Sequence, residues 1–236
     1  MAALAVGAAA VLAGCGGGSG GGGSSTAATS AEQSSQYFPR TPSVTYQATP
    51  PPVAARVRRA AQVAGCTVKG FPMEPVQVQS DGTYHTTGPV TYHVSLPPTS
   101  GLHYPIWADW GVYDVPVPFR FQVHNLEHGG IIIHEGSGLS SAQKDQIVAL
   151  WRQAPAFILV TPETFAQFPK DAVVVTSWQR WMVCKPFSAR SLAAIRVYGD
   201  VYRGTGPEQI GGLDSGQADQ VEGLPRPAIP DPGATP

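Results

Sequence analysis

The chain has 236 residues, a formal net charge of -1 at pH 7 and only 13% charged residues. That length suits one domain of about 100–200 residues with additional segments, and the absence of a basic block in the sequence argues against a nucleic-acid partner. The sequence has no apolar run of 18 residues or more, so we expect no membrane-spanning helix. Its glycines and prolines concentrate toward the two ends, so the middle is richer in core-forming residues than the average composition implies.

Residues 1–15 have the character of an export signal. The segment from Ala2 to Ala13 is short, small and apolar, which is typical of a signal peptide rather than a membrane span. The Leu-Ala-Gly-Cys sequence that ends at Cys15 resembles a bacterial lipobox, which implies cleavage and lipid attachment at Cys15. No Lys or Arg precedes the apolar segment, so a plain secreted protein is the alternative. We expect an extracytoplasmic protein, anchored through lipid to the outer face of the cytoplasmic membrane.

Low-complexity segments flank the expected domain. Residues 16–52 are rich first in Gly and Ser and then in Pro, which is the composition of a flexible and then extended linker. Residues 204–236 carry many Gly and Pro and few apolar residues, so we expect a disordered tail there. The folded domain is therefore expected over residues 53–203.

The folded part begins with two kinds of local signal. The segment Val53–Ala64 predicts a short helix, and Gly65 follows where a helix ends in the left-handed conformation. Residues Gln77–Gln79 and Val90–Val94 alternate and contain β-branched side chains, which predicts two strands. Asp81-Gly82 is a turn signal between them.

A proline-rich loop and an aromatic segment come next. The stretch Leu96–Pro105 is excluded from a helix or central strand, because proline lacks the backbone donor and fixes φ. We expect a stiff loop that presents His103. After the aromatic segment Trp107–Tyr113, the alternating residues Phe119–Val123 predict a strand that leads to His124.

The second half alternates strands and helices. Ile131–His134 predicts a strand, and Ser140 with Gln143 has the spacing of a capping box that opens a helix reaching about Gln153. The remaining expected elements are strands at Phe157–Val160 and Val173–Thr176, a continuation of the latter over Trp178–Cys184, and a last helix from Ser188. This order predicts an α+β fold with a single mixed sheet and packed helices; a purely parallel sheet is the less favoured alternative.

Two thiols remain once Cys15 carries lipid. An even number of cysteines outside the cytoplasm favours a disulfide between Cys66 and Cys184. Closing so long a loop is worth about 4 kcal/mol in the chain-entropy model. The alternative makes Cys184 a metal ligand, with Met182 two residues before it.

All six histidines fall between His85 and His134. Imidazole is the commonest metal ligand in proteins and titrates near neutral pH, so this clustering indicates a site. His124 and His128 would project from one face of a helical turn. We expect a copper or zinc ion bound by the following candidate ligands: His103, His124 and His128, with Glu127 and His85 in support. A sulfur ligand from Met182 or Cys184 would favour copper over zinc at this site.

Two other functions fit the same residues. His124–His128 matches the His-x-x-Glu-His pattern of inverted zinc peptidases, in which Glu127 would activate water. A single turn between two strands would exclude that hydrolase, a long helix would favour it, and nothing in the sequence marks Glu163 or Glu208 as a further ligand.

The last alternative is a binding or structural module of the cell envelope without metal. Asn125, Glu127 and Ser100 would then fix the backbone, and the aromatic segment Trp107–Tyr113 would face a partner. Exposed aromatic side chains would favour this function. The sequence does not identify a protein partner.

Several motifs resemble the bacterial domain-of-unknown-function family 3105. The matching motifs are Ala64-Gly65-Cys66, Pro97-Pro98-Thr99-Ser100-Gly101 with His103, Trp110-Gly111-Val112-Tyr113, His124-Asn125-Leu126-Glu127-His128-Gly129-Gly130 and Thr176-Ser177-Trp178. Gln179 stands where the last motif would have glycine. The resemblance implies an extracytoplasmic, often membrane-anchored setting, and it implies no chemistry.

Overall fold

A computed structural model describes residues 47–75, 83–208 and 216–233. The expected signal, Cys15, most of the linker, the strand Gln77–Gln79 and the turn Asp81-Gly82 lie outside these described residues. Within the described ranges, none of the helices combines the length and the apolar character needed to cross a lipid bilayer.

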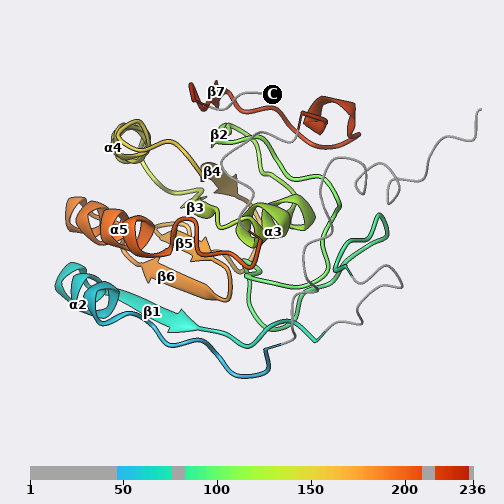
Figure 1. The fold of residues 1–236 in the computed structure, drawn as a ribbon. Coiled ribbons are helices and arrows are strands. Elements are labelled where there is room, and N and C mark those ends of the chain that lie inside the picture. The colour runs from blue at the N-terminus through green and yellow to red at the C-terminus, as the bar shows by residue number, and fades with distance from the viewer. Residues whose placement is uncertain (1–46, 76–82, 209–215, 234–236) are drawn as a thin grey trace, which may run out of the picture.

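The fold is α+β, built on one mixed sheet with the strand order β1-β6-β5-β3-β4-β2-β7 (Figure 1). The central strand β3 pairs in parallel with β4 and antiparallel with β5. The elements are α2 (Ala55–Ala64), β1 (Cys66–Gly70), β2 (Gly111–Val112), α3 (Phe119–Glu127), β3 (Ile131–Gly136), α4 (Ser141–Trp151), β4 (Ile158–Glu163), β5 (Val173–Ser177), β6 (Arg180–Cys184), α5 (Ala189–Tyr202), the 3-10 helix η1 (Ala218–Gln220) and β7 (Ile229–Pro230).

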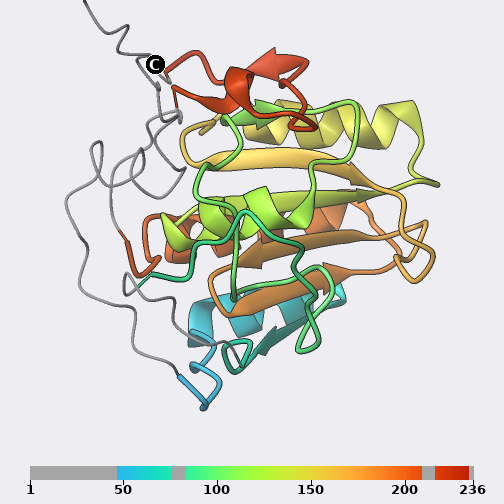
Figure 2. The ribbon, with the colours of Figure 1, turned by 90° about the vertical axis from the view of Figure 1, so that its right-hand side faces the viewer.

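Helices and loops cover both faces of the sheet. Helices α2, α4 and α5 pack on one face, and α3 with the preceding long loop packs on the other (Figure 2). The β3 side chains alternate accordingly: Ile131 and Ile133 join the core under α2, α4 and α5, whereas Ile132 joins the core under α3. The histidine cluster belongs to the α3 face, so the sheet separates it from the larger core.

Local signals at the element ends are confirmed. Gly65 has a φ of 72° and ends α2 in the left-handed conformation. Ser140 and Gln143 form both hydrogen bonds of the capping box that opens α4. Cys66 and Cys184 are joined by a disulfide between the paired strands β1 and β6, which excludes Cys184 as a metal ligand in this state.

Three expected strands differ from the structure. Phe119–Val123 is the start of helix α3, and Val90–Val94 has no strand. The predicted continuation of β5 is instead a separate antiparallel strand, β6, after a turn in which Gln179 has a φ of 57°. Left-handed backbone is the natural place for glycine, which accounts for the glycine expected at this position.

The alternation in Phe119–Val123 is misleading because α3 is buried on nearly every side. Phe121, Val123 and Leu126 are buried together with the polar residues between them. A helix buried all round shows no clear apolar stripe with a 3.6-residue period. Pro118 precedes the helix, and its carbonyl accepts from the amide of Phe121 at 3.0 Å.

Part of the expected disordered tail is ordered. Strand β7 pairs antiparallel with β2, and the amide of Asp231 donates to the carbonyl of Trp110 at 3.1 Å. Ala218 and Leu224 are buried in the core under α3. The tail therefore belongs to the fold over 216–233, since its few apolar residues fall where the sheet edge and the α3 face can bury them.

Candidate metal centre

The stiff loop places His103 beside His85. The amide of Thr86 donates to the carbonyl of His103 at 2.7 Å, and the amide of His103 donates to the carbonyl of Tyr84 at 2.9 Å. These two bonds form an isolated parallel bridge between His85 and His103. Their rings consequently lie with centroids 4.9 Å apart.

Hydrogen bonds fix the same loop just before His103. The hydroxyl of Ser100 accepts from the amide of Glu74 at 3.0 Å, and the carbonyl of Thr99 accepts from the amide of Gln179 at 2.8 Å. Gly101 has a φ of 119°, and its carbonyl accepts from Nδ1 of His103 at 2.8 Å. The imidazole is thereby held in one orientation, with Nε2 available as a ligand.

Helix α3 supplies His124 and Glu127 from one side of its last turn. The carbonyl of Tyr104 accepts from Nδ1 of His124 at 2.7 Å, and Nε2 of His124 lies 3.0 Å from Nε2 of His128. His124 stacks on His85 with ring centroids 4.8 Å apart, and its ring lies 4.8 Å from that of His103. Residues three apart on a helix face the same side, so the carboxylate of Glu127 reaches the same point.

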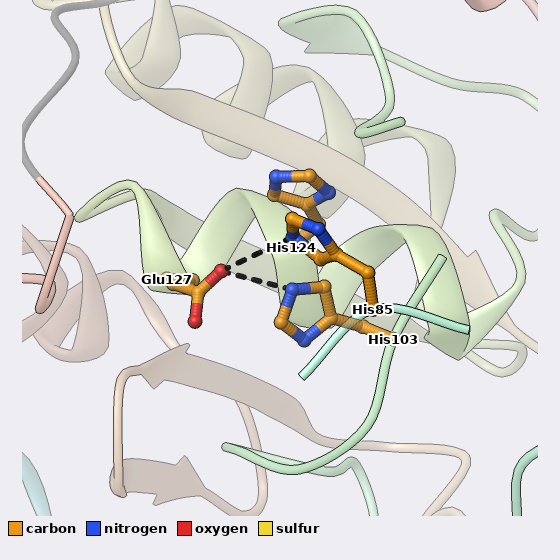
Figure 3. A group of neighbouring side chains, drawn as sticks. All are labelled: His85, His103, His124 and Glu127. Carbon is orange, nitrogen blue, oxygen red and sulfur yellow. Dashed lines mark ion pairs between the residues drawn. The ribbon is translucent and has the colours of Figure 1, made fainter. Parts of the chain in front are cut away.

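Three imidazoles and one carboxylate converge (Figure 3). One ligand atom from each of His85, His103, His124 and Glu127 lies within 4.8 Å of the others. Oε2 of Glu127 is 2.9 Å from Nε2 of His103 and 3.8 Å from Nε2 of His85. A tetrahedral ion with bonds of about 2.0 Å needs donors about 3.3 Å apart, so small side-chain shifts would satisfy it.

Three of the four converging side chains are deeply buried, and the fourth, His85, is 20% exposed. His103 has a relative exposure of 0%, and His124 and Glu127 each have 2%. Nε2 of His103 and Oε2 of Glu127 are close, yet their orientation does not satisfy hydrogen-bond geometry, and neither atom has a hydrogen-bond partner in the described part of the chain. Buried polar atoms are nearly always hydrogen-bonded, so this buried pair without a hydrogen bond is a place that could hold a cation.

The pKa values of the cluster are shifted in different directions. Burial lowers the pKa of His103, but the Glu127 carboxylate more than offsets this and the net shift is upward. Burial raises the pKa of Glu127, but His103 and His85 outweigh it and hold that pKa well below its usual range. Burial and the neighbouring His128 ring hold the pKa of His124 far below its ordinary value. His124 is therefore neutral near pH 7, as a metal ligand must be.

His128 lies next to this group but belongs to a second one. Its Nε2 is 3.0 Å from Nε2 of His124 and 3.4 Å from Oε2 of Glu208. Glu127, His128 and Glu208 form a second set of ligand atoms within 4.8 Å of one another. Nothing in the sequence marks Glu208 as a ligand apart from its position just after the glycines that follow α5.

The other candidate ligands lie elsewhere. Met182 is buried in the core on the opposite face of the sheet, and Cys184 is in the disulfide. His93 is exposed. His134 is buried, with Nδ1 2.7 Å from Oε1 of Glu163 and Nε2 2.9 Å from Oγ1 of Thr176, so both of its nitrogens are already paired.

Comparison with known proteins places the chain in a family. Residues 84–209 match the family described as protein of unknown function, DUF3105. The chain belongs to the DUF3105 family. The match includes every residue of the two ligand sets. No curated protein and no solved structure matches the chain.

The aromatic segment of the DUF3105 domain is buried rather than presented to a partner. Trp107, Trp110 and Tyr113 have relative exposures of 3% or less. The Asn125 side chain accepts from the amide of Ala108 at 3.0 Å and donates to its carbonyl at 2.7 Å. This fixes the aromatic segment on α3, where Trp107 packs against the rings of His124 and His128. The segment therefore supports the histidines.

The length of helix α3 in this DUF3105 domain tests the hydrolase alternative. Helix α3 has nine residues and ends at Glu127, so the motif is neither a single turn between strands nor part of a long helix. A hydrolase would direct Glu127 at a water beside the ion. Oε2 of Glu127 is instead buried 2.9 Å from Nε2 of His103, which favours a ligand role.

Proposed function

We propose that the protein binds a transition metal ion, zinc before copper, through His85, His103, His124 and Glu127. One observation carries this proposal. In His103 and His124 the Nδ1 atom donates to a backbone carbonyl, so Nε2 is the unprotonated nitrogen of each neutral ring, and both residues belong to the buried cluster that contains Glu127. This is the usual arrangement of metal-binding imidazoles. Four protein ligands make a closed site, which suits binding rather than turnover.

The donor set supports zinc. Imidazole nitrogens and a carboxylate are ordinary zinc ligands, whereas Cu(I) is selected by sulfur. Among the described residues, no cysteine joins the cluster, because Cys66 and Cys184 form the disulfide, and Met182 faces the other core. Cu(II) also accepts imidazole, so it is the competitor to measure.

The setting of this function is outside the cytoplasm, on a lipid anchor at Cys15. The apolar segment before Cys15 supports export, and a disulfide supports an oxidising compartment. Labelling cells with a fatty acid tests the anchor: the wild-type chain should carry label and fractionate with membranes, and Cys15→Ser should lose both properties. Equal labelling of the two proteins would contradict the anchor.

Metal titration tests the binding. Purified protein, stripped and then titrated with Zn²⁺ and with Cu²⁺, should bind both, and zinc should remain after dialysis. His103→Ala and His124→Ala should each weaken zinc binding by more than about 100-fold, beyond the roughly 10–100-fold typical of residues that only orient ligands. His93→Ala is the matched control, because this histidine is exposed and outside the cluster.

The opposite result would favour the module without metal. If the wild-type protein binds neither ion, or if His93→Ala weakens binding as much as His103→Ala, the histidine cluster is not a metal site.

A further inference from the structure

We infer that the cluster holds a second divalent cation beside the first, between Glu127, His128 and Glu208, with Glu127 as the bridging carboxylate. This inference rests on the proposed function, because the first ion shares Glu127. The two ligand sets have only this residue in common, and each set has its donor atoms within 4.8 Å of one another.

The backbone brings Glu208 to this point from far along the chain. After α5, the amide of Gly204 donates to the carbonyl of Gly129 at 2.8 Å, and the amide of Glu208 donates to the carbonyl of Glu127 at 3.0 Å. Gly206 lies so close that a Cβ atom would be 2.1 Å from the carbonyl oxygen of Glu127. Residues 204–208 are thus fastened to the end of α3, which positions the Glu208 carboxylate beside His128.

Two buried atoms of Glu127 and His128 lack hydrogen bonds. Oε2 of Glu127 and Nδ1 of His128 make no hydrogen bond to any described residue, although both side chains are only 2% exposed. Oε2 of Glu127 does face Nε2 of His103 at 2.9 Å and Nε2 of His85 at 3.8 Å. Leaving buried polar groups without hydrogen bonds is costly, so cations beside this carboxylate would supply the missing interactions. Because a carboxylate has two oxygens, Glu127 can serve both ions; paired ions in proteins lie about 3.5–4 Å apart.

The contacts of His128 show that the two positions adjoin. Its Nε2 is 3.0 Å from Nε2 of His124, a ligand of the first set, and 3.4 Å from Oε2 of Glu208. His128 therefore stands at the boundary between the ions. The alternative is that His128 is a ligand of the first ion and that Glu208 only accepts a hydrogen bond from His128. The experiment below distinguishes the two arrangements.

The second position differs in character from the first. It has three protein ligands, two of them carboxylates, so coordination positions stay open for water or an anionic group. The Glu208 side chain is 16% exposed, and the His85 side chain of the first set is 20% exposed, so both positions can be reached from solvent. The second ion should bind after the first and more weakly, because it has fewer protein ligands.

Stoichiometry and magnetic coupling test this inference. The stripped full-length protein is titrated with Zn²⁺ by calorimetry and with Cu²⁺ by electron paramagnetic resonance. Wild type should bind two equivalents, and the second Cu²⁺ should broaden the signal of the first through dipolar coupling. Glu208→Gln should bind one equivalent with an unbroadened signal. Glu222→Gln, which changes an exposed carboxylate of the C-terminal segment, should behave as wild type.

The outcomes separate the two proposals. One equivalent in the wild type, with affinity lowered by His128→Ala, would overturn the second ion and leave the first standing. Two equivalents that persist in Glu208→Gln, or a second Cu²⁺ that leaves the first signal unbroadened, would also overturn it. No binding at all would overturn both proposals.

Discussion

Oε2 of Glu127 lies 2.9 Å from Nε2 of His103, and both side chains are almost fully buried. Helix α3 carries the carboxylate, and a proline-bordered loop hydrogen-bonded to Gln179 and Glu74 through Thr99 and Ser100 carries the imidazole. Two rigid elements therefore hold an ionisable pair together in a buried position. A charge pair enclosed in this way is costly unless further interactions compensate it, and a cation bound by both residues would provide that compensation.

Removing the charge of Glu127 should impair metal binding more than any other conservative change in the cluster. Glu127→Gln keeps the size of the side chain but removes the anion that both ligand sets share, so zinc affinity should fall at least about 100-fold, more than for a residue that only orients a ligand. Glu163→Gln is the control: it changes another buried carboxylate paired with a histidine, His134, outside both sets. Equal losses in the two variants would mean that the effect is structural.

Replacing Gly206 should displace the segment that carries Glu208. In Gly206→Ala the new methyl group would meet backbone atoms of Glu127 and Gly129 at 2.1 and 2.2 Å, so the segment must move away from α3. Weaker binding of the second ion and faster amide exchange in the segment should follow. Gly199→Ala is the control, since a Cβ there meets nothing within 4 Å outside its own helix and alanine favours helix. Unchanged exchange in Gly206→Ala would contradict this packing.

The disulfide should contribute much of the stability of the domain. Cys66 and Cys184 are 118 residues apart, and closing so long a loop is worth about 4–5 kcal/mol in the chain-entropy model. The double variant Cys66→Ser with Cys184→Ser should therefore lose several kcal/mol of unfolding free energy in urea titrations. A loss below about 1 kcal/mol would show that the cross-link restricts the denatured chain much less than the chain-entropy model assumes.

Glu135 should make the protein less stable as pH rises. Burial raises the pKa of Glu135 in the folded state, so the unfolded chain loses this proton first. The resulting decrease in the free energy of unfolding is absent below the unfolded-state pKa and grows until pH passes the folded-state pKa. Oε1 of Glu135 has no hydrogen-bond partner among the described residues, so Glu135→Gln should stabilise by about 1 kcal/mol at pH 7 and by less at pH 4. Urea titrations at both pH values test this, and an equal effect at both would refute it.

Short-range signals account for what the sequence predicts correctly. The capping box at Ser140 and the left-handed Gly65 depend only on neighbouring residues. The strands Ile131–His134 and Val173–Thr176 are apolar β-branched runs, as central strands buried on both faces are. The disulfide is predictable from the even number of cysteines left after Cys15 and from the expected compartment.

Long-range packing accounts for what the sequence misses. Helix α3 is buried on nearly all sides, so its apolar residues alternate in the sequence as they would in a strand. β7 is a two-residue edge strand that exists only because β2 is there to pair with it. The clustering of the histidines predicts one site with His103, His124 and His128, supported by Glu127 and His85. It cannot separate His128 from the others, because that separation depends on Glu208, which lies beyond α5.

Anomalous X-ray diffraction from crystals grown with zinc tests the central claim most directly. Data on either side of the zinc absorption edge should show a peak within about 2.0–2.2 Å of Nε2 of His103, Nε2 of His124 and a carboxylate oxygen of Glu127. A map without a peak at this point, or with zinc bound only at surface residues such as His93, would contradict the claim that these buried side chains form a metal site.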